Sequence, residues 1–223
     1  MQDTVIWDRV REARKGPRPA HTLDDIARAA ISVGDANGVE AVSIRAVAAQ
    51  LGAGAASLYR YISRKDDLYD LMVDSVAAEY ELPSVPSGEW EADVVLVARR
   101  IRDVYRRHPW MAELAPHASW GPNTQDYMEF FLAALEPTGL GHVERIEFIG
   151  LMSAWIATFT QLVQQPAATG AGRLRHFASI AADPARPQLA QAIVALMRAD
   201  PSSSSPDQLF ERGLHRLIHG IAG

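Results

Sequence analysis

The stretch from Ser43 to Lys65 gathers hydroxyls, arginines, tyrosines and a lysine on a short, regularly patterned segment. It reads SIRAVAAQLGAGAASLYRYISRK, which predicts two short helices joined by a glycine-bearing turn. A helix-turn-helix of this kind lays its second helix in the major groove of DNA. The chemistry expected here is therefore hydrogen bonding to base edges and pairing with phosphates.

The second of these helices needs one face for a core and another for the groove. Leu58 and Ile62, four residues apart, are expected in the core. Ala55 and Ala56 are small enough to let the backbone approach DNA and to touch thymine methyl groups. The remaining candidates for contacts with base edges or phosphate oxygens are Arg45, Ser57, Tyr59, Arg60, Tyr61 and Lys65.

Helix-capping patterns predict the elements that hold this segment. Thr22 with Asp25 forms a capping-box pattern at the start of a first helix, which Asn37-Gly38 ends. Ser43 is expected to cap the second helix, and the third is expected over 55–61. Ser63, with Asp66 three residues later, is expected to cap the fourth.

The rest of the chain also has helical periodicity and no alternating strand pattern. The sequence predicts an all-α protein with an N-terminal three-helix helix-turn-helix domain and a C-terminal helical domain. The expected domains are a basic arm (1–20), the DNA-binding domain (21–81), a Pro/Ser-rich linker (82–88) and the C-terminal domain (89–223). Helices after the linker are expected over 89–107, 109–115, 123–135, 142–165, 187–199 and 207–221.

Composition bounds the class of protein. The chain has 223 residues, 48% of them hydrophobic, and no cysteine, which excludes disulfides, thiolate catalysis and cysteine-based zinc sites. No uninterrupted run of 18 apolar residues and no apolar signal region occur, so we expect a cytoplasmic protein that does not span a membrane.

Charge is distributed unevenly along the chain. Its formal net charge is −5, yet residues 1–65 carry ten Lys and Arg against seven Asp and Glu. Within the arm, residues 9–18 hold five basic side chains and one acidic one, Glu12. This arm is either a soluble tail or a segment that contacts phosphates or the minor groove.

Residues 22–80 resemble the DNA-binding domain of the tetracycline-repressor (TetR) family of transcriptional regulators. The resemblance is carried by Ile26, Ala27, Ala30, Gly38, Ser43, Ile44, Arg45, Val47, Ala48, Leu51, Gly52, Ser57, Leu58, Tyr59, Tyr61, Lys65 and Leu68. It implies that Arg45, Ala55, Ala56 and Tyr59 face bases, and that Ser43, Ser57, Tyr61 and Lys65 hold phosphates. The chain departs from the family at Gly54, where Ser or Thr often caps the helix, and at Ala55 and Ala56, which replace residues that are often polar.

The same resemblance implies a ligand-binding and dimerisation domain after the linker. The helix over 142–165 is apolar on two sides, which predicts burial all round. The helix over 207–221 has one apolar stripe, with Gly213 and Gly220 allowing close approach of another helix. We expect a homodimer through these two helices, with a monomer core as the alternative.

Bulky side chains in this domain exceed the needs of a small bundle. They are expected to line a pocket for a small, largely apolar effector, or else to form plain core: Trp110, Trp120, Tyr127, Met128, Phe131, Trp155 and Phe159. No cofactor or metal is expected. His117 lies near the place of a magnesium-ligating histidine in the tetracycline repressor, but its surroundings differ, and His215 and His219 lack a third ligand.

The sequence therefore predicts a ligand-responsive repressor that binds a palindromic DNA operator as a homodimer. One alternative is a DNA-binding regulator without a small-molecule ligand. The other is an all-α enzyme, which the sequence disfavours because it contains no G-x-S-x-G, H-E-x-x-H or P-loop motif.

Overall fold

The computed structural model of the chain describes residues 6–7, 21–164, 171–198 and 205–220. Every regular element in these residues is helical, which confirms the predicted all-α class. The chain divides into two compact units, one ending at Gln161 and the other beginning at Leu162. The predicted boundary at a linker over 82–88 stays a prediction, because both sides of that segment belong to the first unit.

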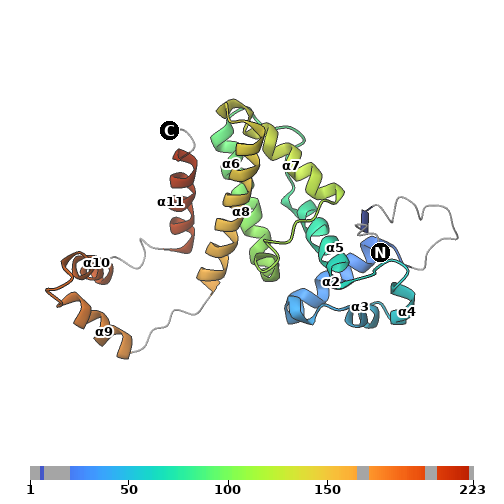
Figure 1. Ribbon diagram of the computed structural model, residues 1–223, viewed down its shortest axis with the longest axis horizontal. Coiled ribbons are helices and arrows are strands. Elements are labelled where there is room, and N and C mark those ends of the chain that lie inside the picture. The colour runs from blue at the N-terminus through green and yellow to red at the C-terminus, as the bar shows by residue number, and fades with distance from the viewer. Residues whose placement is uncertain (1–5, 8–20, 165–170, 199–204, 221–223) are drawn as a thin grey trace. The chain divides into compact units, whose positions relative to one another are not determined.

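The first unit begins with the predicted helix-turn-helix (Figure 1). Its elements are α2 (Leu23–Asn37), the 3₁₀ turn η1 (Val39–Ala41), α3 (Ile44–Gln50), α4 (Ala55–Leu58) and α5 (Lys65–Ala77). α2 packs on both α3 and α5. The core between them is fully buried at Ile26, Val47, Leu58, Ile62 and Leu68, so the predicted inward positions of Leu58 and Ile62 are confirmed.

Two of the predicted caps are present. The Thr22 hydroxyl accepts a hydrogen bond from Asp25 N at 3.1 Å, and the Asp25 carboxylate accepts from Thr22 N at 2.9 Å. The Asp25 carboxylate accepts from both the backbone N and the hydroxyl of Thr22, and these two bonds, with the ion pair to Arg28, lower the pKa of Asp25 to about 2. Ser43 Oγ accepts from Ala46 N at 3.1 Å and caps α3.

Two predicted boundaries are wrong. The third helix ends at Leu58 rather than Tyr61, and α5 begins at Lys65 with Arg64, not Ser63, at its N-cap position. The cause is Asp67, one residue beyond the predicted partner Asp66. Its fully buried carboxylate accepts from Ser63 N at 2.6 Å and from Arg64 N at 3.1 Å, which fixes the entry to α5.

The body of the first unit follows α5. Its elements are η2 (Ala78–Tyr80), α6 (Trp90–Arg107), η3 (Pro109–Ala112), α7 (Pro122–Ala134), η4 (Glu136–Thr138) and α8 (His142–Gln164). α5 and α6 each pack on α7, around the buried side chains of Val94, Val97, Ile101 and Phe131. These helices agree with the predicted ones to within a few residues, except that only Pro109–Ala112 of the expected 109–115 is helical.

The prediction that the helix over 142–165 is buried all round is wrong for the single chain. α8 buries Ile149, Met152 and Ile156, whereas Leu151 and Leu162 are 69% and 66% exposed. By length and composition α8 could cross a membrane, and 28% of its most apolar window is buried. A core helix meets the same criterion, and the exposed leucines leave an apolar face that the chain itself does not cover.

The second unit contains α9 (Ala171–Ala181), α10 (Pro187–Arg198) and α11 (Pro206–His219). α9 and α10 pack against each other. The sequence did not predict α9, because Pro and Gly over 166–172 indicated a break; α9 includes Gly172 within its first turn. On α11, Phe210, Leu214 and Ile218 are buried, which confirms the predicted apolar stripe.

Candidate DNA-reading surface and ligand cavity

The turn between α3 and α4 sets the position of the predicted DNA contacts. Gly52 has φ of +64°, a left-handed conformation that glycine adopts without steric cost, and it turns the chain between the two helices. Arg45, in the first turn of α3, is exposed, as is Ser43 before it. The Ser43 hydroxyl is already used as the α3 cap, so its lone pair is occupied while its proton stays free for a phosphate oxygen.

Gly54 provides no side chain to cap α4, and its carbonyl oxygen accepts two hydrogen bonds from Ser57. Ser57 Oγ donates to the Gly54 carbonyl at 2.7 Å, and Ser57 N donates to the same oxygen at 2.9 Å. A contact from the Ser57 hydroxyl to a phosphate would require this bond to break. Ala55 is half-buried and Ala56 exposed, so Ala56 presents the more accessible methyl group.

The turn after α4 carries the largest exposed side chains of the surface. Tyr59 is 56% exposed and Arg60 is exposed, with the Arg60 guanidinium 4.6 Å from the centre of the Tyr61 ring. The Tyr61 hydroxyl is buried and has no hydrogen-bond partner among the described residues. Of the two tyrosines, Tyr59 is therefore the more accessible to a partner.

Lys65 is the first residue of α5, and its ammonium group interacts with the side chains of Tyr69 and Glu40. Its Nζ lies 5.2 Å from the Tyr69 ring centre and 3.8 Å from Glu40 Oε2. The hydrogen bond with Tyr69 is the main cause that raises the pKa of Lys65. Of the nine predicted DNA-contact residues, Ser43, Arg45, Ala56, Tyr59 and Arg60 are exposed, Ala55 and Lys65 are half-buried, and the hydroxyls of Ser57 and Tyr61 are engaged or buried.

A cavity of about 670 Å³ lies in the body of the first unit. Its lining comes from α5, α6, α7, α8 and the loop from Glu113 to Gly121. Of the seven predicted pocket residues, Trp120, Tyr127 and Met128 line it. Most of the other lining side chains are apolar, which suits a largely apolar ligand.

The other four predicted pocket residues lie elsewhere. Trp110 is buried and donates its indole N–H to Asp35 Oδ1 at 2.7 Å, and Phe131 is fully buried in the helix core. Trp155 and Phe159 lie together on α8 with ring centres 5.6 Å apart, and neither lines the cavity. We therefore leave these four out of the proposed pocket.

Polar residues of the cavity escaped the sequence reasoning. Tyr80 and Tyr105 line it together with Tyr127, so three phenol groups come from η2, α6 and α7. Burial raises the pKa of Tyr105 to about 12, and burial likewise raises the pKa of Tyr80 and Tyr127 well above the usual value. All three phenols therefore stay protonated at neutral pH and can donate hydrogen bonds. Tyr105 follows Ile101 by four residues on the apolar stripe of α6, which is the signal that could have found it.

The cavity wall between Glu113 and Thr124 is bound to α5 by two buried aspartates, one helical turn apart. Asp70 Oδ1 lies 3.0 Å from His117 Nε2, and this hydrogen bond raises the pKa of His117. Ser119 Oγ donates to the Asp70 carbonyl at 3.0 Å. Asp74 accepts from Thr124 N at 2.9 Å and from Asn123 Nδ2 at 3.2 Å. These hydrogen bonds tie the wall to α5.

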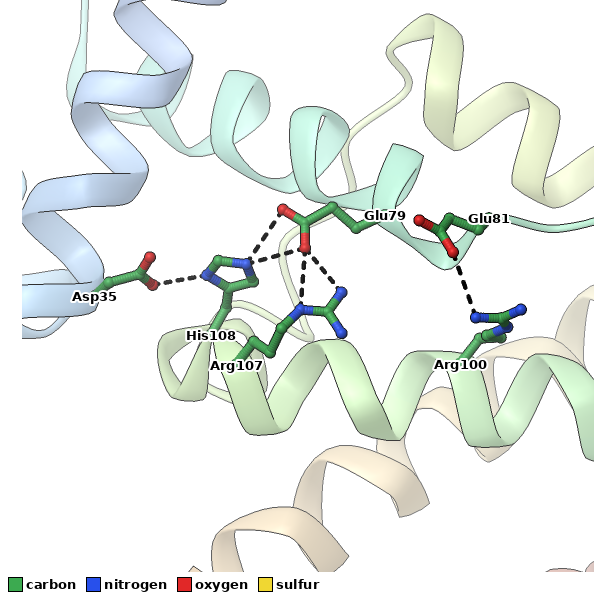
Figure 2. A network of polar contacts seen from close by, with 6 residues as sticks. All are labelled: Asp35, Glu79, Glu81, Arg100, Arg107 and His108. Atoms are coloured by element: carbon green, nitrogen blue, oxygen red, sulfur yellow. Dashed lines mark hydrogen bonds and ion pairs between the residues drawn. The ribbon is translucent and has the colours of Figure 1, made fainter.

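A polar network joins the DNA-reading part to the body. Figure 2 shows the His108 imidazole between Asp35 of α2 and Glu79 of η2. The distances are 2.7 Å from Nδ1 to Asp35 Oδ1 and 3.2 Å from Nε2 to either Glu79 oxygen. Arg107 Nη2 donates to Glu79 at 2.8 Å, so α2, η2 and the end of α6 share one network.

The described residues offer no group of three or more His, Asp or Glu side chains that could hold a metal ion. His117 pairs with Asp70, and the stacked rings of His215 and His219 lie 6.1 Å apart on α11. Eighteen of the first twenty residues, 1–5 and 8–20, lie outside the described part of the chain, so the structure does not test whether the arm is a soluble tail or a segment that contacts DNA.

Known protein families match both the N-terminal and the C-terminal part of the chain. Residues 26–72 match the family of bacterial regulatory proteins of the TetR type, and residues 82–223 match the tetracycline repressor-like C-terminal domain. The HTH-type transcriptional repressor DrrR1 of Streptomyces coeruleorubidus is 39% identical over 167 residues, which are 73% of this chain and 62% of DrrR1. An HTH-type transcriptional regulator of Saccharopolyspora erythraea is 38% identical over 63% of this chain and 59% of its own length. The match thus spans about three fifths of these two relatives.

Solved structures resemble the whole chain. Apo ActR from Streptomyces coelicolor has a TM-score of 0.77 and 28% identity, with 93% of this chain and 97% of that chain covered. ActR in complex with actinorhodin has a TM-score of 0.75, covering 92% and 96%. Because the matched C-terminal domain alone covers more than half of the sequence, the chain belongs to the tetracycline-repressor family of bacterial regulatory proteins.

Proposed function

We propose that this chain is a DNA-binding transcriptional repressor that a small molecule releases from its operator. The observation that carries the proposal is the placement of α5. This helix begins at Lys65, beside the DNA-reading surface, and its Asp70 and Asp74 hold the wall of the cavity. A ligand that displaces the wall would shift α5 and with it the DNA-reading surface, which is a population shift between two states.

The proposed DNA contacts divide into base contacts and phosphate contacts. Arg45, Tyr59 and Arg60 are exposed and long enough to reach base edges, and the Ala56 methyl group can contact a thymine methyl group. Ala55 would let the backbone approach the groove. Phosphates would be held by Ser43, Ser57, Tyr61 and Lys65, which requires the Ser57 and Tyr61 hydroxyls to leave the positions described above.

We further propose that the working form is a homodimer through the helices over 142–165 and 207–221. The support is the apolar face of α8 that stays exposed in the single chain, at Leu151 and Leu162. A twofold dimer would place two recognition helices in successive major grooves, about 34–36 Å apart, on a palindromic operator. A DNA-binding role of this kind also places the protein in the cytoplasm.

The proposed effector is a flat, largely apolar molecule with hydrogen-bond acceptors. Trp120 and Met128 offer apolar surface, and the protonated phenols of Tyr80, Tyr105 and Tyr127 offer donors. ActR, which has the same fold and 28% identity, is known in complex with actinorhodin. Actinorhodin is therefore the first probe to test here.

The experiment is selection of bound duplexes from a random DNA pool by the purified full chain at near-physiological salt. We expect a palindrome with half-sites about one helical turn apart. Sequence-blind, salt-sensitive binding alone would contradict the proposed reading role. The selected operator then serves in a release assay with actinorhodin and related aromatic compounds.

Release separates the proposed function from its alternatives. A constitutive regulator would bind the same palindrome and keep it at every concentration of every compound tested. An all-α enzyme would select no palindrome, and turnover of a compound that enters the cavity would reveal it.

A further inference from the structure

The side chains of Ile6 and Trp7 are partly or fully removed from solvent within the first unit. Ile6 is fully buried and Trp7 is half-buried. A Cβ atom at Gly121 would overlap both the Trp7 ring and the carboxyl group of Asp74 on α5. The position between the indole and the carboxylate therefore accepts only a glycine.

Gly121 belongs to the cavity wall. It follows Trp120, which lines the cavity, and it precedes Pro122, the first residue of α7. Asp74, which Gly121 touches from the other side, is the residue that accepts from Thr124 N and Asn123 Nδ2. Trp7 is not a lining residue, so it contacts the wall without entering the cavity.

The contact between Trp7 and the wall is apolar. The Trp7 indole nitrogen is buried, and no hydrogen-bond partner lies within reach among the described residues. Burial of the indole and of Ile6 must therefore hold this pair in place, and a buried N–H without a partner carries a cost. Such a contact is non-directional and can be remade when the wall shifts.

We propose that Trp7 is a positioning residue of the ligand cavity. Ile6 anchors it, and its indole keeps Gly121 against Asp74, so that the wall over 113–124 stays on α5. Trp7 thereby has a regulatory role that does not depend on whether the basic arm is a soluble tail or contacts DNA. The effect on ligand response rests on the proposed function, whereas the effect on the wall does not.

Hydrogen–deuterium exchange of the full chain tests the effect on the wall. In Trp7→Ala, amides of residues 113–124 are expected to exchange on the order of tenfold faster, because the contact that holds them is lost. Amides of α3 and α4 are expected to exchange as in the wild type. Trp7→Phe retains a ring over Gly121 and should restore most of the protection. Arg28→Ala, at a side chain that is 72% exposed on α2, should change nothing in the wall.

A second variant changes the residue of the wall that contacts Trp7. Gly121→Ala should also accelerate exchange over 113–124, and the effects of Gly121→Ala and Trp7→Ala should not add, because both open one contact. Unchanged exchange of the wall in Trp7→Ala would overturn the proposal. So would equal acceleration in every helix, because it would make Trp7 a general stabiliser.

Operator release gives the regulatory readout. The actinorhodin concentration that releases half of the selected operator is expected to differ at least severalfold between Trp7→Ala and wild type, because the wall is coupled to α5. If wild type is not released by actinorhodin, the ligand part of the proposed function fails, while the exchange result still decides the role of Trp7. If wild type is released and the Trp7→Ala midpoint is unchanged, the regulatory role is wrong.

Discussion

The Asp35 carboxylate and the His108 imidazole lie 2.7 Å apart, and this contact joins α2 of the DNA-reading part to the end of α6. The same Asp35 oxygen accepts from Trp110 Nε1 at 2.7 Å, and the other ring nitrogen of His108 faces Glu79. One aspartate and one histidine thus connect three elements. Rotation of α2 relative to α6 would break the contact between Asp35 and His108.

His108→Ala is expected to lower the free energy of unfolding by about 1–3 kcal/mol, because it removes one hydrogen-bond partner from each of two part-buried carboxylates and leaves Asp35 with Trp110 and Glu79 with Arg107. Urea denaturation followed by circular dichroism measures this loss. Arg100→Ala is the matched control in the same region (Figure 2), because it breaks only the exposed 3.5 Å pair with Glu81. That control should stay within about 0.5 kcal/mol of wild type, and an equal loss in both variants would contradict the prediction.

Arg45→Ala and Tyr59→Ala are each expected to weaken binding to the selected operator by about 1–3 kcal/mol without unfolding the protein, because each removes a contact with a base edge. Fluorescence anisotropy with a labelled operator measures affinity, and thermal denaturation checks folding. Arg28→Ala removes an equal charge from the exposed side of α2 and serves as the control. Wild-type affinity in both test variants would refute the assignment of α3 and α4 to base reading.

The fold followed from the sequence wherever a local pattern fixed it. The Thr22–Asp25 capping box and the Leu58–Ile62 spacing both depend on neighbours in the chain, and the structure confirms both. The start of α5 was predicted one residue early because Asp66 has Ser63 three residues before it, as a capping box requires, whereas Asp67 has Arg64 at that distance. Only the burial of Asp67 decides between them.

The site was less predictable because its contacts are distant in sequence. His117 meets Asp70 across 47 positions, and the indole of Trp110 meets Asp35 across 75. An aromatic residue in an all-α body can line a cavity or fill a core, and sequence spacing does not separate the two. Both Trp120 and Phe131 were predicted to line the pocket, but only Trp120 lines the cavity, and Phe131 is buried in the core.

The His117–Asp70 pair predicts a dependence of stability on pH. Asp70 raises the pKa of His117, so the folded chain holds this proton more tightly than the unfolded chain does. The stabilisation is fully present below the unfolded pKa of about 6.5 and is lost as the pH rises through the folded value. Wild type should therefore lose more stability than Asp70→Asn between about pH 6 and 8.5. Parallel pH profiles in urea denaturation would contradict this.

Tyr105→Phe removes one donor from the cavity and keeps the ring. It is expected to weaken actinorhodin binding by about 0.5–1.5 kcal/mol, the net contribution of a hydrogen bond, while operator affinity without ligand stays at the wild-type value. Quenching of tryptophan fluorescence, with Trp120 in the lining, measures ligand affinity. Tyr59→Ala is the reciprocal control, since it should weaken operator binding and leave ligand affinity unchanged. Loss of both activities in Tyr105→Phe would indicate a folding defect.

Leu151→Asp tests the proposed dimer at the exposed face of α8. Leu151 is 69% exposed in the single chain, so a charge there costs the isolated fold little, but it would place a carboxylate in an apolar seam if two α8 helices meet. We expect light scattering at micromolar protein to show a dimer for wild type and a monomer for Leu151→Asp, with unchanged helix content. Val85→Asp is the matched control, because Val85 is equally exposed at 69% and lies outside the α8 face. A dimer in both variants would place the interface elsewhere, and a monomer in wild type would remove the basis for a palindromic operator, since one copy reads one half-site.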